Sequence, residues 1–154
     1  MRSTAMYRQK SMSLQSQTSP DVFEFFFEVE PVPASRPRVS RWGTHYGKRY
    51  ESFRRAMRHC LLDVKPTRKL TGPIEAELEF IVRKSKSSKR RHPRGDVDNF
   101  VKGPLDSMTQ AEKFWDDDDQ VVVLVASKRF AEKNEKHGIR IRYRESTRNT
   151  PTLS

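Results

Sequence analysis

The sequence lacks the features that are typical of disulfide-bonded, membrane, nucleotide-binding and zinc-binding proteins. It has one cysteine, Cys60, so it cannot form an internal disulfide, and we expect a packed thiol in a reducing compartment such as the cytoplasm. No apolar run approaches the roughly 20 residues that a transmembrane helix needs, so we expect no membrane association. Glycine-rich phosphate-binding loops and Cys or His pairs at zinc spacing are also absent.

A calcium-binding loop is excluded as well. The stretch that begins at Asp96 is acidic, but Phe100 and Val101 stand where such a loop needs a ligand and a glycine. The four histidines are scattered along the chain, which favours surface or DNA contacts over a shared ligand role. Zinc, calcium and nucleotide-binding chemistries therefore find little support.

Basic residues outnumber acidic ones by 31 to 20, and six of the nine aspartates are concentrated in two places. The net charge is +11 and the pI is near 10.1, which indicates a polyanionic partner such as nucleic acid. Within this basic chain, one acidic group holds Asp96 and Asp98, and a second runs from Asp116 to Asp119. Crowded carboxylates repel each other, and a hard divalent cation such as Mg²⁺ removes that repulsion. A basic protein with such a cluster is suited to phosphodiester cleavage.

The length and composition predict one small domain. With 154 residues and 34% hydrophobic content, the chain can bury only a modest core. Residues 1–20 are rich in Ser, Gln and Thr, and we expect a disordered leader there. Residues 146–154 are expected to form a disordered tail. The folded domain is therefore predicted to span residues 21–145.

Apolar periodicity within this domain predicts an α+β fold with a mixed β-sheet of about four strands and two main helices, in the order β-α-β-α-β-β. Strands are predicted near residues 23–29, 74–82, 120–130 and 139–143, from alternating or continuous apolar patterns. Helical spacing is found over residues 53–64 and again from Asp96. Gly103-Pro104 interrupts the second helix, so we expect a kink there or a helix that begins at Pro104.

Two features of the last strands bear on function. The Val-rich start of the 120–130 strand predicts a central strand buried on both faces. In the final strand Arg140, Arg142 and Arg144 alternate with apolar residues, which predicts a row of arginines on one face. That face could contact DNA or only solvent, and the pattern does not decide between them.

Two basic segments are candidate DNA contacts. One is the acid-free run that leads into Asp96, and we favour a DNA-binding arm over a solvated loop because its cations could hold a phosphate backbone above the carboxylates. The other is an extended, proline-containing loop over residues 31–47. The candidate DNA-binding residues are Arg36, Arg38, Arg83, Lys84, Lys86, Lys89, Arg90, Arg91 and Arg94.

The acidic residues also admit ordinary structural roles. Asp96 or Asp98 could cap a helix, Asp98 and Lys102 could form an i, i+4 salt bridge, and the four-Asp turn could merely be solvated. The alternative is that Asp96, Asp98 and one of Asp117 or Asp118 converge on a shared ion. Because all of these residues lie in one contiguous stretch, we expect each subunit to carry a complete carboxylate cluster.

The motifs around these residues resemble the RusA-type Holliday-junction resolvases. The resemblance covers about residues 94–128 and rests on Asp96-Val97-Asp98-Asn99-Phe100-Val101-Lys102, on Leu105-Asp106-Ser107-Met108, on Phe114-Trp115, and on Asp117-Asp118-Asp119-Gln120-Val121-Val122. It implies that Asp96, Asp98, Asp118 and Lys102 are catalytic. The stretch from Gln110 to Lys113 is about one residue longer than the pattern, so Asp117 or Asp119 could replace Asp118 as the third metal ligand.

The resemblance also implies an activity and an assembly. The expected activity is hydrolysis of branched DNA, chiefly four-way junctions, with Mg²⁺ as the cofactor and Mn²⁺ as a substitute. The expected assembly is a homodimer, and the expected setting is the cytoplasm of a bacterial host, with a phage or prophage gene. Two alternatives stay open at this point. One is a broader nuclease for flaps and Y-junctions, and the other is a non-catalytic nucleic-acid-binding protein.

Overall fold

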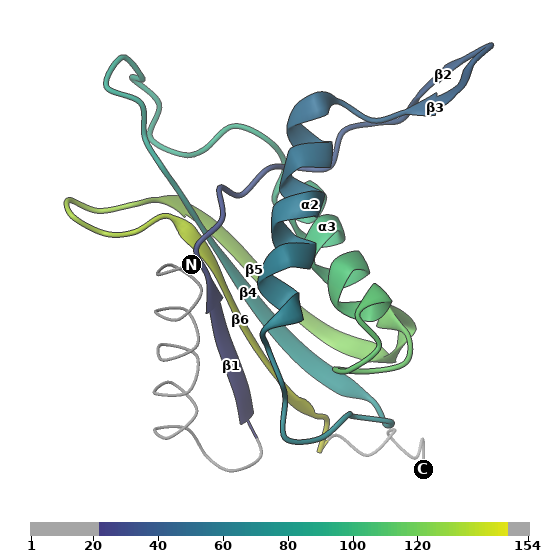
Figure 1. The fold of residues 1–154 in the computed structure, drawn as a ribbon. Helices are drawn as coiled ribbons and strands as arrows, with labels where there is room; N and C mark the ends of the chain where they lie inside the picture. Colours follow the sequence, from purple (N-terminus) through teal and green to yellow (C-terminus); the bar gives the residue numbers. More distant parts are fainter. Residues whose placement is uncertain (1–21, 148–154) are drawn as a thin grey trace, which may run out of the picture.

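A computed structural model describes residues 22–147 of the chain. The predicted leader and nearly all of the predicted tail lie outside the described residues. The elements are β1 (Val22–Phe27), β2 (Arg38–Ser40), β3 (Gly43–His45), α2 (Lys48–Leu62), β4 (Ile74–Val82), α3 (Val97–Gln110), the short 3₁₀ helix η1 (Asp118–Gln120), β5 (Val121–Phe130) and β6 (Gly138–Glu145) (Figure 1).

The main structure is a four-stranded sheet in the order β1-β6-β4-β5. The β1–β6 and β6–β4 pairs are antiparallel, whereas β4 and β5 are parallel and are connected through α3. The two helices pack on one face of this sheet (Figure 1), and a separate two-stranded hairpin, β2–β3, projects from the body. The predicted α+β architecture and element order are confirmed.

The core lies between the helices and one face of the sheet. Phe23, Phe25 and Phe27 alternate along β1 and are buried, as the period of two predicts. They pair in register with alternate residues of β6, and Phe23 stacks on Tyr143 with ring centroids 4.9 Å apart. From the helices, α2 contributes Tyr50, Phe53, Met57 and Leu61, and α3 contributes Phe100, Val101, Leu105 and Met108.

The interruption at Gly103-Pro104 does not divide α3. The helix runs continuously from Val97 to Gln110 with Pro104 inside it, so the expectation that it begins at Pro104 is wrong. Packing against α2 accounts for this, because both residues are buried and Gly103 lies against Phe53 and Tyr50 of α2. A β-carbon at Gly103 would lie 2.7 Å from Cε1 of Phe53, so only glycine permits this close approach. Tertiary contact thus outweighs a local helix-breaking signal.

The prediction that the 120–130 strand is central and buried on both faces is wrong. β5 is an edge strand, and Val122, Leu124 and Val125 are 59%, 46% and 55% exposed. A continuous apolar run signals burial on both faces only if other elements cover both faces. Over residues 22–147 α3 covers only part of one face of β5 and no strand pairs with its outer edge. The sheet therefore ends in an exposed apolar strand.

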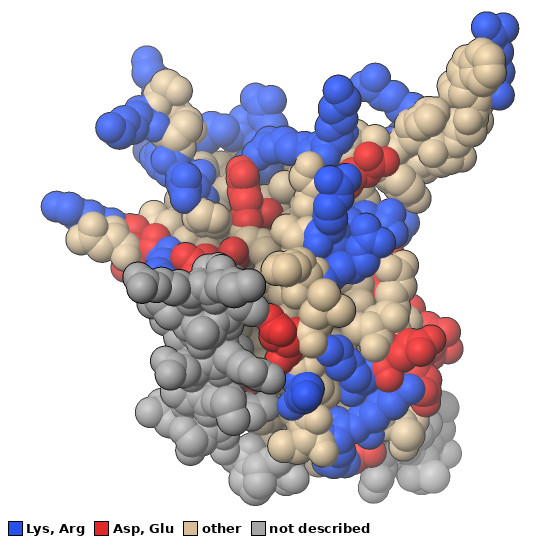
Figure 2. Space-filling model, in the orientation of Figure 1, with Lys and Arg blue, Asp and Glu red and all other residues tan. Residues whose placement is uncertain are grey.

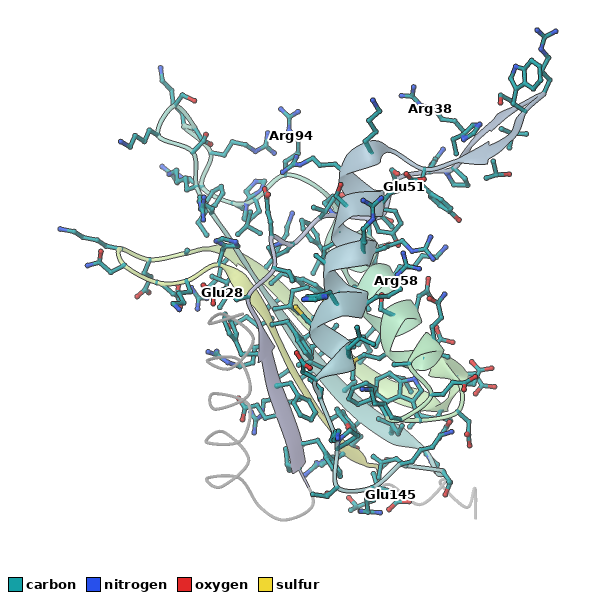
Figure 3. The ribbon with its side chains drawn as sticks, viewed as in Figure 1. Glu28, Arg38, Glu51, Arg58, Arg94 and Glu145 are labelled. Carbon is teal, nitrogen blue, oxygen red and sulfur yellow. The ribbon has the colours of Figure 1, made fainter. Side chains whose placement is uncertain are left out.

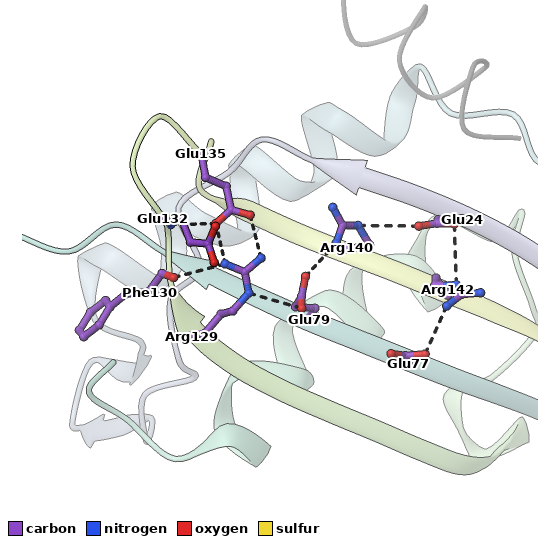
Figure 4. A network of polar contacts seen from close by, with 9 residues as sticks. All are labelled: Glu24, Glu77, Glu79, Arg129, Phe130, Glu132, Glu135, Arg140 and Arg142. Atoms are coloured by element: carbon purple, nitrogen blue, oxygen red, sulfur yellow. Dashed lines mark hydrogen bonds and ion pairs between the residues drawn. The ribbon is translucent and has the colours of Figure 1, made fainter. Parts of the chain in front are cut away.

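The outer face of the sheet, opposite the helices, is a ladder of ion pairs between strands (Figure 4). Arg140 lies 2.9 Å from Glu79 and 3.7 Å from Glu24, and Arg144 lies 2.8 Å from Glu75. Arg142 is placed between Glu24 and Glu77, at 3.7 and 3.8 Å. The arginine row is thus matched by glutamates on its neighbours, and the local charge largely cancels. This favours a solvated face over a DNA-facing one.

One further ion pair holds the β5–β6 connection. Arg129 makes a two-pronged contact with Glu135, at 2.5 and 2.7 Å, and the backbone N–H of Glu132 donates to the same carboxylate at 2.9 Å. Hydrogen bonding to Arg129 is the main cause that lowers the pKa of Glu135 from its usual 4.5 to about 2. A depressed carboxyl pKa adds stability above pH 4.5 that is lost as the pH falls through 2.

Replacing Glu135 with glutamine should therefore lower the Tm at pH 7. The difference in Tm between the variant and the wild type should become smaller as the pH falls from 4.5 toward 2. Thermal unfolding followed by circular dichroism across this range measures it. The control is Glu132→Gln, which removes an exposed carboxylate from the same loop and should leave the Tm close to wild type. A difference in Tm that stays constant with pH would mean that the Glu135 charge does not stabilise the fold.

Candidate active site and nucleic-acid interface

The first acidic group stands at the start of α3, and its carboxylates are exposed. Asp96 occupies the N-cap position, but its side chain makes no capping hydrogen bond. Asp98 lies in the first turn, where the partial positive charge of the helix end favours an anion. No ion pair joins Asp98 to Lys102 in the described part of the chain. The capping role of Asp96 and the salt bridge are thus not realised, and these carboxylates remain available to a ligand.

Contacts from two other segments fix this end of α3. The backbone N–H of Ala34 donates to the Asn99 carbonyl at 2.8 Å. Lys128, on β5, donates from its ammonium group to the Pro93 carbonyl at 2.8 Å and to the Gly95 carbonyl. Gly95 has φ of +98°, and a β-carbon there would lie 3.0 Å from Pro33. The segment before Asp96 is therefore held by β5 and by the start of the 31–47 loop.

The second acidic group forms a rigid turn at the entry to β5, and Gln120 organises it. Its side-chain oxygen accepts from the backbone N–H groups of Asp116 and Asp117 at 2.8 and 2.9 Å. Its side-chain nitrogen donates to the carbonyls of Leu70 and Gly72, both at 3.0 Å. One glutamine thus ties the acidic turn to the segment before β4.

The four aspartates of this turn have different environments. Asp116 pairs with Lys69 at 2.6 Å, and Asp117 accepts the backbone N–H of Asp119 at 3.1 Å. Asp118 is half-buried, whereas Asp119 is exposed. Asp116 and Asp117 are thus engaged with a lysine and a backbone N–H, and of the other two aspartates only Asp118 is half-buried.

Asp118 is also the aspartate of this turn whose charged form is destabilised by its surroundings. Burial raises its pKa, and a hydrogen bond to Asp117 and repulsion from Asp106 add to the increase. The pKa of Asp117 is lowered, chiefly because the backbone N–H of Asp119 stabilises its charge. A cation bound here would stabilise the charged form of Asp118. Sequence reasoning gave Asp106 no role, although it continues the Asp98 and Lys102 stripe at the next i+4 position.

The two acidic groups do not meet within one chain. Asp118 lies near Asp106, and Asp106 follows Asp98 by eight residues, about 12 Å along the helix at 1.5 Å per residue. Over residues 22–147 no three carboxylate, His or Cys residues are close enough together to hold a metal ion. The expectation of a complete cluster in each subunit is therefore not met. The reason is topological. The first acidic group stands where α3 begins and the second follows the end of α3, so the length of the helix lies between them (Figure 1).

The basic segments lie at the same end of the molecule as the first acidic group (Figures 1 and 2). The loop between β4 and α3 and the β2–β3 hairpin project there from separate places, and Figure 3 labels Arg94 on the loop and Arg38 at the base of the hairpin. All nine predicted DNA-binding residues are exposed. None of them forms an ion pair with a carboxylate in the described structure. Their positive charge is therefore open to an anionic partner.

Two of the nine have weaker contacts within the chain. A guanidinium nitrogen of Arg83 lies 3.0 Å from Nδ1 of His137, and the Lys84 ammonium lies 5.3 Å from the centre of the Phe130 ring. These contacts orient the start of the loop without cancelling its charge. Asp96 and Asp98 thus stand beside two unpaired basic segments.

Comparison with known proteins agrees with this arrangement. A family model described as Endodeoxyribonuclease RusA matches residues 28–142, which include both acidic groups and both basic segments. The chain belongs to the RusA endodeoxyribonuclease family. No curated protein matches it. The RusA match extends well beyond residues 94–128, on which the sequence motifs rest, so the family prediction is confirmed over most of the chain. Among residues 22–147, no helix is long and apolar enough to cross a membrane.

Proposed function

We propose that this RusA-family protein is a Mg²⁺-dependent endodeoxyribonuclease that resolves four-way DNA junctions by paired phosphodiester hydrolysis. The observation that carries the proposal is the exposed, unpaired Asp96 and Asp98 at the start of α3, flanked by basic segments whose charges are also unpaired. Carboxylates with no partner beside cations with no partner fit a phosphate backbone and a bridging metal ion. Family membership supports the nuclease chemistry.

The metal ligands that we propose are Asp96, Asp98 and Asp118. They present only oxygen atoms, which suits Mg²⁺, with Mn²⁺ as a substitute. Asp118 is preferred to Asp117 because Asp117 already accepts a backbone hydrogen bond, whereas the Asp118 carboxylate is destabilised by its surroundings. When bound, the metal would polarise the scissile phosphate and lower the pKa of a water molecule. Lys102 would stabilise the negative charge that gathers in the transition state.

The separation of the acidic groups supports a homodimer in which two chains complete each site. The exposed apolar edge of β5 is a suitable contact, because long uncovered edge strands tend to pair with another strand. A two-fold axis beside β5 and perpendicular to the sheet would pair β5 with its copy in antiparallel fashion. The two α3 helices would then lie on the same face and run in opposite directions.

Such a dimer would change which acids are neighbours. Antiparallel α3 helices would place the Asp98 end of one subunit beside the Asp118 end of the other. Each pair of opposite ends would form one site, so two sites would be related by the two-fold axis. A four-way junction has near two-fold symmetry and needs two opposed nicks, and this arrangement fits that need.

Neutralising Lys89, Arg90 and Arg91 together should weaken binding to all DNA shapes and flatten its dependence on salt. Each lost phosphate contact should reduce the slope of log affinity against log salt by about 0.9. Fluorescence anisotropy with labelled DNA at several salt concentrations measures the slope. The control is Arg142→Gln, because Arg142 is already paired on the outer sheet face. An unchanged slope in the triple variant would show that this loop does not contact phosphate.

The proposed activity is tested by incubating the protein with labelled four-way, Y-shaped and linear DNA, with Mg²⁺ or with a chelator. We expect symmetrical paired cleavage of the four-way DNA with Mg²⁺ only. Equal cleavage of Y-shaped DNA would favour a broader branched-DNA nuclease, and binding without any cleavage would favour a non-catalytic binding protein. We further propose that the enzyme acts in the cytoplasm of a bacterial host and is encoded by a phage or prophage.

A further inference from the structure

We propose that Trp42, at the tip of the β2–β3 hairpin, stacks on the exposed face of a base at the branch point of the DNA. This inference rests on the proposed function and adds a contact with the bases to the phosphate contacts of the basic segments. Trp42 belongs to the two-residue turn between β2 and β3 and is 78% exposed. Its neighbour on the hairpin, Val39, is 82% exposed. A large aromatic surface left in water is unfavourable unless a partner covers it.

The surroundings of the hairpin indicate a polyanion as that partner. No acidic residue occurs from Pro31 to Tyr50. Arg36, Arg38 and Arg41 make no ion pair in the described structure, and the guanidinium carbon of Arg41 lies 4.9 Å from the centre of the Trp42 ring. An aromatic ring beside an arginine on a basic arm is the combination that binds unpaired nucleotides, with the ring stacking on a base and the cations holding the backbone.

The hairpin is also joined directly to the proposed active site. The Ala34 N–H bonds to the Asn99 carbonyl, and Pro33 packs against Gly95, so the base of the hairpin is fixed beside Asp98. Trp42 follows Ala34 by eight residues, which span at most about 28 Å. At 3.4 Å per base step, the stacked base would lie within about eight nucleotides of the phosphate at Asp98. At a branch point stacking is interrupted, so a base there can lack a stacking neighbour on one face, whereas in a linear duplex this holds only at the ends.

The test compares Trp42→Ala and Trp42→Phe with wild type in binding to four-way DNA and to linear duplex, in chelator so that no cleavage occurs. Trp42→Ala should weaken four-way binding by about 5- to 100-fold, the usual effect of losing one aromatic stacking partner. Trp42→Phe should keep most of the affinity. Binding to linear duplex should change by less than about twofold. Val39→Ala, on the same hairpin, is the matched control and should bind both DNAs as wild type does.

Intrinsic fluorescence gives an independent readout. Of the two tryptophans, Trp115 is fully buried, so a change in emission on adding four-way DNA should come from Trp42 and should vanish in Trp42→Phe. An equal loss of affinity for both DNAs in Trp42→Ala would overturn the inference. Unchanged binding to four-way DNA would overturn it too, and a change in the sedimentation of Trp42→Ala would then assign Trp42 to a contact between subunits. These measurements do not depend on cleavage. Failure of the nuclease proposal would instead appear as absence of cleavage by the wild type.

Discussion

Asp98→Asn is expected to abolish Mg²⁺-dependent cleavage of four-way DNA while binding survives or becomes tighter. The amide keeps the size of the side chain but removes the charge that holds the metal ion. Loss of even an outer partner of a metal ligand costs about 10- to 100-fold in activity, so loss of a direct ligand should exceed about 100-fold. Binding should not suffer, because repulsion between the carboxylate and phosphate is also removed. Cleavage rates and binding affinities measured on the same DNA separate the two effects.

The four-Asp turn supplies the comparison for this result. Asp118→Asn should be as damaging as Asp98→Asn, whereas Asp116→Asn should retain most of the activity because Asp116 is engaged with Lys69. All three substitutions remove one negative charge at an exposed or half-exposed position, so general electrostatic effects are matched. Cleavage near the wild-type rate in Asp98→Asn would remove Asp98 from the site. A reversed order of Asp116 and Asp118 would show that the turn was aligned wrongly with the motif.

Mixing Asp98→Asn subunits with Asp118→Asn subunits is expected to restore cleavage that neither variant shows alone. If each site takes Asp98 from one chain and Asp118 from the other, a mixed dimer contains one doubly altered site and one intact site. It should therefore nick one strand of a four-way DNA without completing resolution. If each chain carried a whole site, every site in the mixed dimer would lack one ligand and nothing would be restored.

The β5 edge provides the control for that experiment. Leu124→Arg places a charge on the exposed apolar edge without touching any proposed ligand, and it should yield a folded monomer. Introduced into both variants, it should prevent restoration. Analytical ultracentrifugation and circular dichroism establish the assembly and the fold. Restored cleavage by subunits that sediment as monomers would refute the two-fold arrangement.

Much of the fold was predictable because local patterns and tertiary structure agree. The alternation of Phe23, Phe25 and Phe27 identified β1, and helical spacing around Met57 identified α2, since each pattern matches the one face that the element buries. The acidic motif was readable for a related reason. Six of the nine aspartates fall in two short groups of this basic chain, so Asp96 and Asp98 stood out before any geometry was known.

Other features depend on partners that no local pattern specifies. The apolar run of β5 indicates that something covers it, but it does not distinguish a neighbouring strand of the same chain from a second subunit. The separation of Asp98 from Asp118 depends on the direction of α3 between two parallel strands, which neither motif encodes. The role of Asp106 beside Asp118 was hidden because a single acid at an i+4 spacing is common on helices.

The ion-pair ladder on the outer face of the sheet has a consequence for how the protein meets its target. With Arg140, Arg142 and Arg144 matched by glutamates, that face contributes little to the long-range field. The excess positive charge of the described residues is then weighted toward the end that carries the hairpin and the β4–α3 loop (Figure 2). A field with this asymmetry turns the molecule during diffusion, so that encounters with DNA begin at the acidic motif rather than at the sheet. Association should therefore be fast at low salt and already oriented.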